Sequence, residues 1–359
     1  MPQKEVYGAQ PPIELLRMWA DHGFWYDLND REKKYLENMQ LICTMGPPSS
    51  GRNMITRRFL RQFYILFTEP FDEKSLSTIF TSIMDWYFLG IKGKLPSSIE
   101  ALKPNVVDAT IKLYNKVINR LLPTPKKSHY IYNLRDVSRV IQGITKANLR
   151  SYSDPNDMIK LWAHECMRVF SDRLASKEDL AMFNEDILKI VMNDSFKKPW
   201  NTVVKIEPLL FGSFIPTRYP DNDNTKPAYP DVYCELINRE NLVSYSERYL
   251  QKYNDGGSTN EKGEKDRLNL VLFMTALEHL VRIVRILGTP YGHALLVGVG
   301  GSGKKSLAKL ATYISSYDRY QIEITKNYDY KKDWPESLQK LLKKCGVENR
   351  PTTFLFSDS

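Results

Sequence analysis

The stretch Gly292–Ser306, GHALLVGVGGSGKKS, decides the fold of this 359-residue chain. An apolar segment runs into a glycine-rich loop, and a helical pattern follows the loop. Backbone N–H groups presented by glycines and the positive end of a helix both bind phosphate oxygens, so this order predicts a phosphate-binding loop. The alternative is a glycine-rich hairpin without a ligand. The residues expected to surround the phosphates of ATP or ADP are Gly298, Val299, Gly300, Gly301, Ser302, Gly303, Lys304, Lys305 and Ser306.

One position of the loop departs from the Gly-x4-Gly-Lys-[Ser/Thr] pattern. In that pattern a hydroxyl directly after the lysine ligates magnesium. Here Lys305 follows Lys304, and Ser306 comes one residue late. We therefore expect the loop to bind phosphate better than it positions Mg²⁺, with Ser306 as an uncertain metal ligand.

A second candidate metal ligand, Asp358, closes an apolar run about fifty residues after Lys304. P-loop proteins hold magnesium through such a strand-end acid, and hydrolytic members add a glutamate as general base. Ser359 takes the place of that glutamate, and its hydroxyl is not basic at neutral pH. The site is therefore expected to bind nucleotide and to hydrolyse it poorly. The alternative for Asp358 is an ordinary carboxylate at a strand end.

Composition indicates a soluble globular chain of about two or three domains, with 42% hydrophobic residues. No apolar run approaches the roughly 20 residues of a membrane span, and the start has no signal core. The four cysteines are far apart, which favours buried thiols over disulfides or zinc. The net charge of +9 permits binding to nucleic acid, a membrane surface or an acidic partner and does not select among them. The basic residues are scattered along the chain, which indicates solvated surface.

The first half of the chain predicts an α/β segment followed by a helical bundle. The first segment is expected to hold helices at 11–20, 55–62 and 72–89, and strands at 39–45 and 64–67. Apolar residues at three- and four-residue spacing then predict a bundle. Its expected helices span 97–122, 133–149, 155–175 and 177–192.

The second half predicts a doubly wound α/β sheet. Prolines between 198 and 233 indicate a connection between domains, followed by helices at 234–253 and 267–287. Strands are expected before the loop and at 320–325 and 352–356, with helices at 304–316 and 334–345. A three-stranded sheet that stops there suggests a piece of a longer polypeptide, truncated at both ends.

Several stretches resemble one family, the axonemal dynein heavy chains. The loop segment from Gly292 resembles the phosphate loop of their fourth AAA+ module. Stretches that resemble the third module, in the right order, are Met1–Arg17, Met45–Asn53, Asn133–Arg139, His164-Glu165 and Arg168–Leu174. The resemblance covers essentially the whole chain.

The resemblance implies a P-loop AAA+ fold and a place in a six-module ring. Residues 1–96 would be the C-terminal part of the third module's α/β subdomain, and 97–197 its helical lid. Residues 198–266 would be a linker with the start of the fourth module, and 267–359 its P-loop core, truncated at Walker B.

The resemblance also implies function: an ATP-driven, minus-end-directed microtubule motor that produces beating in the ciliary or flagellar axoneme. The implied partners are the other AAA+ modules, dynein intermediate and light chains, axonemal proteins, and the microtubule through a coiled-coil stalk outside this segment. Nucleic acid and membrane are not implied. Principal hydrolysis would lie in the first module, while this site binds ATP or ADP in a structural or regulatory role.

Site roles follow from the same resemblance, residue by residue. Asp358 would be the Walker B acid, and Arg135 would be the lid arginine called sensor 2. The sensor 1 position falls on Gly46, which has no side chain to orient water. Arg58 is the candidate arginine finger and Arg61 its alternative; ion pairing of both arginines is the competing interpretation.

Three further interpretations complete the sequence picture. His164-Glu165 lacks a second histidine and is read as a packed helix position rather than zinc ligands. Tyr291 or His293 could approach the nucleotide. The competing functions are a nucleic-acid translocase or clamp-loader-like AAA+ protein, which should show a basic stripe with interleaved aromatics, and a small-molecule P-loop kinase.

Overall fold

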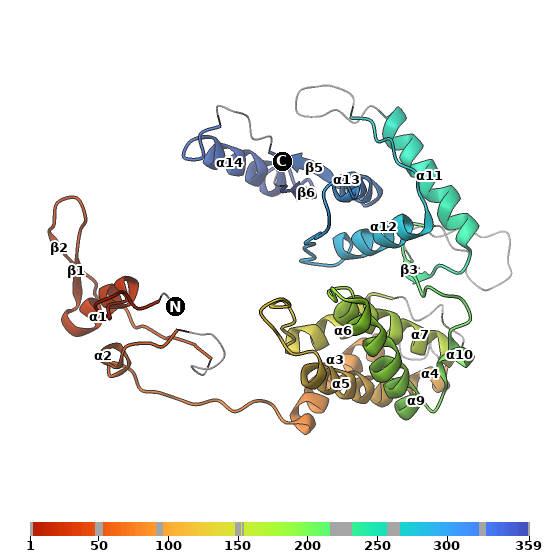
Figure 1. Ribbon diagram of the computed structural model, residues 1–359, viewed down its shortest axis with the longest axis horizontal. Coiled ribbons are helices and arrows are strands. Elements are labelled where there is room, and N and C mark those ends of the chain that lie inside the picture. Colours follow the sequence, from red (N-terminus) through yellow and green to blue (C-terminus); the bar gives the residue numbers. More distant parts are fainter. Residues whose placement is uncertain are drawn as a thin grey trace. The chain divides into compact units, whose positions relative to one another are not determined.

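The computed structural model describes residues 3–46, 53–90, 96–147, 152, 154–215, 232–256, 266–322 and 328–357 (Figure 1). The chain divides into two compact units, Met1–Phe71 and Asp72–Ser359. The first is a small helix and hairpin unit. The second contains a helical bundle and an α/β part, each with its own apolar core.

The first unit begins with helix α1 (Pro11–His22), which Gly23 ends at a φ of 76°. An antiparallel pair follows, β1 (Phe24–Tyr26) with β2 (Lys33–Tyr35), and later a single helical turn, α2 (Arg57–Leu60). Its small core consists of Ile13, Ile55 and Phe59.

Two strands expected in this unit do not form. Residues 39–46 and 64–67 are irregular, and Ile42 and Tyr64 are 89% and 100% exposed. A strand is stable only when a neighbour satisfies its backbone groups. Within the described part of this unit, strand pairing is confined to β1 and β2, so the apolar composition of these two segments was misleading.

The predicted helical bundle is confirmed, although three of its helices are divided. The break within 97–122 falls at Ala101-Leu102, just before Pro104 in the first turn of the next helix. Two π-helical segments, η2 and η3, continue α7 and α8. The elements are α3 (Glu73–Leu89), α4 (Ser97–Glu100), α5 (Lys103–Arg120), α6 (Leu134–Lys146), α7 (Pro155–Cys166), η2 (Met167–Ser171), α8 (Lys177–Met182), η3 (Phe183–Lys189) and α9 (Ile190–Phe196).

Side-chain caps fix the starts of the bundle helices. Asp72 accepts a hydrogen bond from the Ser75 amide at 3.0 Å and caps the start of α3. Asn133 and Asp136 form a reciprocal capping box at the start of α6.

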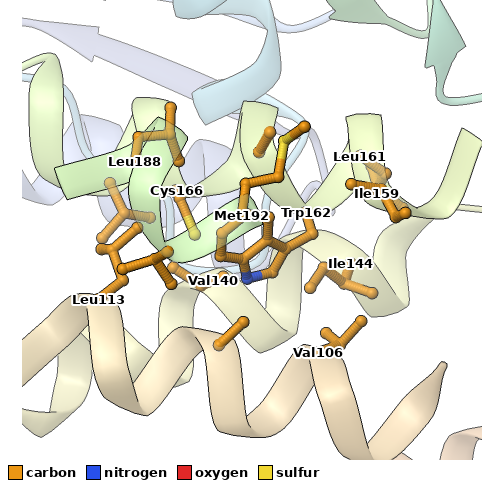
Figure 2. Packing of buried hydrophobic residues seen from close by; sticks show 14 of the residues in the cluster. Val106, Leu113, Val140, Ile144, Ile159, Leu161, Trp162, Cys166, Leu188 and Met192 are labelled. Atoms are coloured by element: carbon orange, nitrogen blue, oxygen red, sulfur yellow. The ribbon is translucent and has the colours of Figure 1, made fainter. Parts of the chain in front are cut away.

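The core of the bundle is built around Trp162 of α7 (Figure 2). Figure 2 shows this indole among apolar side chains from α5, α6, α7 and α9, including Val106, Ile144 and Met192. The indole Nε1 donates to Thr110 Oγ1 at 3.0 Å, which satisfies the polar edge of a fully buried ring.

The described part of the connection between the bundle and the α/β part packs into both apolar cores. It contains α10 (Trp200–Val203) and the short antiparallel pair β3 (Phe211–Gly212) and β4 (Cys234–Glu235). Leu209 and Phe211 belong to the bundle core, whereas Leu210 belongs to the second core. Because successive side chains of an extended chain point to opposite sides, this segment joins both cores.

The α/β part confirms the expected alternation of strands and helices after the loop. Strand β5 (Asp318–Gln321) pairs in parallel with β6 (Thr352–Leu355), and α14 (Asp333–Gly346) connects them. Before them lie α11 (Arg239–Asp255), α12 (Met274–Leu287) and α13 (Lys304–Ile314).

Three expectations for this part need correction. The helix predicted from residue 234 begins at Arg239, after β4. The helix predicted from residue 267 begins at Met274, because the Asn254 side chain bonds both the N–H and the C=O of Leu268 and holds that stretch extended. The strand predicted before the loop does not form: residues 292–299 are irregular, and Leu295 and Val297 are largely exposed. The described sheet therefore has two strands, β5 and β6.

Candidate nucleotide-binding site

The glycine-rich loop leads directly into α13 and uses glycine where the backbone requires it. Gly301 and Gly303 have φ values of 75° and 77°, a region that side chains with a Cβ rarely adopt. Gly303 is also the N-cap of α13. A Cβ added at Gly300, Gly301 or Gly303 would meet no atom within 4 Å, so this side of the loop faces open space. The loop thus has room for a ligand over its backbone.

The Lys304 side chain folds over the same loop. Its Nζ donates to the carbonyl oxygens of Gly298 and Val299, both at 2.7 Å, and lies 3.2 Å from Ser302 Oγ. This places a positive charge on the loop at the N-terminal end of α13. A phosphate group fits this donor set, because it can accept hydrogen bonds from the ammonium and from N–H groups at a helix start.

The start of α13 carries no competing negative group. Gly303 provides no side-chain cap, and the first turn contains no Asp or Glu. Lys305 and Ser306 lie half-buried in that turn, ahead of the buried Leu307. The helix macrodipole therefore favours an anion at this end.

For a metal the described residues offer less. Among them, no group of three or more His, Cys, Asp or Glu side chains gathers closely enough to hold an ion. Asp358 and Ser359, the expected Walker B position and its neighbour, lie outside the described residues. The structure thus supports a phosphate site and leaves the magnesium ligands as a sequence-based expectation.

Two sets of contacts hold α13 in place. On its apolar face, Leu310 and Ala311 share a core with Leu277 and Leu280 of α12. These contacts bury the apolar face of α12 against α13.

The second set of contacts is polar and centres on Asp266. Its carboxylate accepts hydrogen bonds from Lys309 Nζ of α13 at 2.9 Å, from the Tyr253 hydroxyl at 3.0 Å and from Arg319 of β5. Burial opposes ionisation of this carboxyl, but the two cations outweigh it and keep the pKa of Asp266 below its usual range. Asp266 therefore links α11, α13 and β5.

The other predicted site residues are placed as follows. Tyr291 lies just before the loop segment, 95% exposed and at a φ of 56°, and His293 is also exposed. In the first unit, Arg58 pairs with Glu14 at 3.4 Å and Arg61 with Asp21 at 3.3 Å, and both arginines remain largely exposed. These pairs match the ion-pair interpretation, while the finger role stays a prediction.

The candidate sensor 2 and sensor 1 positions, Arg135 and Gly46, both lie among the described residues. Arg135 is exposed in the first turn of α6, with its backbone N–H bonded to Asn133 Oδ1. Gly46 lies in the irregular segment that replaces the predicted strand. Their sensor roles remain expectations from the resemblance.

A buried polar cluster was largely missed by sequence reasoning. His164 and Glu165 are buried in α7, which confirms that they are packed helix positions. Glu165 is bonded by Tyr233 and Arg285, residues far away in the chain. The only sequence signal was a charged pair inside an apolar helix, and it did not identify either partner.

No helix in the described ranges combines the length and hydrophobicity needed to cross a lipid bilayer.

Comparison with known families identifies three consecutive parts of the chain. Residues 1–71 match the family described as "P-loop containing dynein motor region". Residues 90–180 match "Dynein heavy chain, ATPase lid domain", and residues 268–359 match "P-loop containing dynein motor region D4". The lid match falls on the helical bundle, and the D4 match contains the Lys304 loop.

Individual relatives extend the match to the whole chain. Dynein axonemal heavy chain 3 of Homo sapiens is 41% identical over 372 aligned positions, and dynein axonemal heavy chain 1 of Mus musculus is 42% identical over 369. Each alignment covers 100% of this chain and 8% of the relative, so the chain spans under a tenth of their length. The fold is accordingly that of P-loop AAA+ motor regions with their lid, a family assignment that implies nucleotide binding. The chain belongs to the dynein heavy chain family and corresponds to a section of its motor region.

Proposed function

We propose that the loop at Lys304 binds ATP or ADP and serves the motor mainly as a structural or regulatory site. The observation that carries this proposal is the position of the Lys304 ammonium over a loop whose Gly301 and Gly303 adopt glycine-specific backbone angles. When bound, a nucleotide would supply phosphate oxygens for these donors. Gly298 to Gly303 and the first turn of α13 would hold the phosphates, and Lys304 would balance their charge.

Hydrolysis at this site is proposed to be slow. Lys305 stands where a magnesium-ligating hydroxyl is expected, and Ser359 stands where hydrolytic modules have a general base. Ser306 and Asp358 would be the ligands of any bound Mg²⁺. The nucleotide would then be held between neighbouring modules rather than turned over.

For the whole heavy chain we propose the activity that the relatives' names indicate, an ATP-driven axonemal motor of cilia or flagella. Its partners would be the other AAA+ modules, the microtubule and further axonemal proteins. Within this section, residues 1–197 would complete the third module and 198–359 would begin the fourth. Arg135 would reach the phosphates of the third module's own nucleotide, and either Arg58 or Arg61 would reach the nucleotide of the preceding module.

The first test is equilibrium binding of ADP and ATP to the full 359-residue chain. We expect one nucleotide per chain, and we expect Lys304→Ala to weaken binding by about a hundredfold, or ~2.7 kcal/mol, because charged hydrogen bonds to phosphate are lost. Lys340→Ala, at an exposed position of α14, should bind like the wild type. Equal binding by the wild type and Lys304→Ala would refute the proposal.

A second measurement addresses turnover. With ATP bound in a single-turnover experiment, phosphate release by the chain should stay near the rate seen with Lys304→Ala. Release that is well above this background and requires Lys304 would show that the site is hydrolytic.

A further inference from the structure

Glu165 is a buried carboxylate whose partners come from several elements. Its side chain is fully buried in α7. The Tyr233 hydroxyl donates to Oε1 at 2.6 Å, and Arg285 of α12 donates through Nε at 3.2 Å and through a second nitrogen to Oε2. This is a bidentate guanidinium–carboxylate pair, the geometry in which arginine binds a carboxylate most specifically.

The pair connects two separate apolar cores. The neighbours of Glu165 in α7, including Leu161 and Trp162, belong to the bundle core. Val281 and Val284, beside Arg285 in α12, belong to the α/β core. The Glu165–Arg285 pair is therefore a polar joint between the lid bundle and the part that carries the phosphate loop.

The bundle also holds the backbone of Arg285. Lys146 Nζ, near the end of α6, donates to the Arg285 carbonyl oxygen at 3.1 Å, and Thr289 Oγ1 donates to the same oxygen at 2.8 Å. A cation at the last carbonyls of a helix satisfies them and complements the helix dipole. Thus Glu165 of α7 binds the side chain of Arg285, and Lys146 of α6 binds the C-terminal end of α12.

Gly143 has no side chain and so leaves room for the Glu165 carboxylate. A Cβ built at Gly143 of α6 would overlap the Glu165 carboxylate. Burial opposes ionisation of Glu165, but Arg285 and the hydrogen bond with His164 keep the pKa of this carboxyl low. An isolated charge at such a depth would be strongly unfavourable, so removal of either partner should disturb the joint more than an exposed pair would.

A continuous path leads from this joint to the phosphate loop. α12 packs along α13 through Leu280 and Leu310, and α13 begins at Lys304. The C-terminal end of α12 is followed by Thr289 and then by the segment that enters the loop at Gly298. A shift of α12 would therefore displace the segments on both sides of the loop.

We propose that the Glu165–Arg285 joint positions the phosphate loop, so that nucleotide affinity at Lys304 depends on this contact with the lid bundle. The inference rests on the proposed function and adds a means of regulating the same site. Glu165, Arg285 and Lys146 are positioning residues here, because they act on the loop through α12. Nucleotide binding and the packing of α6 and α7 against α12 should then favour each other.

The test compares ADP binding and hydrogen exchange in the full chain, four single variants and one double variant. Arg285→Lys keeps the positive charge but cannot form the bidentate contact, and Glu165→Gln removes the negative charge. Gly143→Ala displaces the Glu165 carboxylate without altering Glu165 or Arg285. The matched control is Asp179→Asn, because Asp179 bonds Lys127 and Tyr130 entirely within the bundle.

In the wild type, ADP should slow amide exchange in α6 and α7 as well as in the loop. Arg285→Lys, Glu165→Gln and Gly143→Ala should each bind ADP at least about fivefold more weakly and lose the response in α6 and α7. Asp179→Asn should retain the wild-type ADP affinity and the exchange response in α6 and α7, even if its unfolding temperature falls. The double variant E165Q/R285K should bind ADP no more weakly than the single variant that binds it more weakly. The two substitutions break the same contact, so their effects should not add.

The outcomes separate this inference from the proposed function. If Arg285→Lys and Gly143→Ala bind ADP like Asp179→Asn and keep the exchange response, the joint is merely structural and the inference is overturned. These two variants retain both charges of the pair, so they remain informative if Glu165→Gln does not fold. If the wild type binds no ADP, the proposed function is wrong and the inference falls with it.

Discussion

Lys304 Nζ donates to the carbonyl oxygen of Gly298 at 2.7 Å, so the lysine of the loop is bonded to the loop's own backbone. The same ammonium reaches Val299 O at 2.7 Å. Phosphate oxygens carry full negative charge and are stronger acceptors than neutral carbonyls. A bound nucleotide can therefore replace the two carbonyl oxygens as the hydrogen-bond acceptor of Lys304 Nζ. This exchange needs no metal beside the lysine.

The first prediction concerns magnesium and Lys305. In the wild type, chelation of Mg²⁺ should change ADP affinity only slightly, because no hydroxyl directly follows Lys304. Lys305→Thr restores that hydroxyl, and chelation should then weaken binding by about tenfold, or ~1.4 kcal/mol. Titrations of ADP with and without EDTA check this, with Lys340→Thr as the control. A large loss of wild-type affinity on chelation would show that another group ligates the metal.

The second prediction concerns the core of the lid bundle. Thr110 Oγ1 accepts from the buried Trp162 indole and donates to Val106 O at 2.7 Å. Thr110→Val removes the acceptor and leaves the indole N–H without a partner, which should lower the unfolding free energy by about 1–3 kcal/mol.

Thr78 is the matched control for Thr110. It makes the same bond to the carbonyl four residues earlier, at 2.9 Å in α3, but it is exposed. Urea unfolding should therefore show little change for Thr78→Val. Equal losses in the two valine variants would contradict the role assigned to the indole bond.

The helical half of this fold was predictable because its signals are local. Asp72 begins α3 as a side-chain cap, and apolar periodicity from Val106 to Val117 gives the buried face of α5. The loop was equally clear, since Gly301 and Gly303 occupy positions that require positive φ. Such features depend on residues a few positions apart, which a single sequence displays directly.

The errors arose where structure depends on distant residues. Leu268 resembles the start of a helix, yet Asn254 bonds both its backbone groups and keeps it extended. The apolar segment around Leu295 has strand composition, but strand formation needs a paired neighbour. Glu165 was recognised as a packed residue, while its partner Arg285 lies 120 positions later. Long-range pairing of this kind leaves almost no local pattern.

The third prediction compares two carboxylates that each face two cations. Asp266 is largely buried between Lys309 and Arg319, whereas Asp318 is 43% exposed between Lys344 and Arg350. Asp266→Asn should lower the unfolding free energy by roughly 2 kcal/mol, because it leaves partly buried cations poorly paired. Asp318→Asn should cost less than about 1 kcal/mol. Similar losses in urea unfolding at low salt would mean that burial does not set the strength of the Asp266 network.

The fourth prediction is a loss of stability in mild acid that originates at His164. Burial lowers the pKa of His164 from 6.5 to about 4, with further effects from Glu165, Arg168 and Arg285. Between these two pH values the unfolded chain binds a proton that the folded chain excludes, so stability falls as the pH is lowered through this window. At about 1.4 kcal/mol per unit of pKa difference, the loss over the whole window is about 3–4 kcal/mol.

Urea unfolding between pH 4.5 and 7 measures this effect. His164→Asn should remove most of the pH dependence, leaving the smaller contribution of His279, whose pKa is also lowered by partial desolvation. Carboxylates whose pKa is lowered in the fold, such as Glu165 and Asp266, contribute only at the acid end, since their unfolded forms titrate near 4. If His164→Asn retained the full slope above pH 5, the loss would have to come from groups other than this buried imidazole.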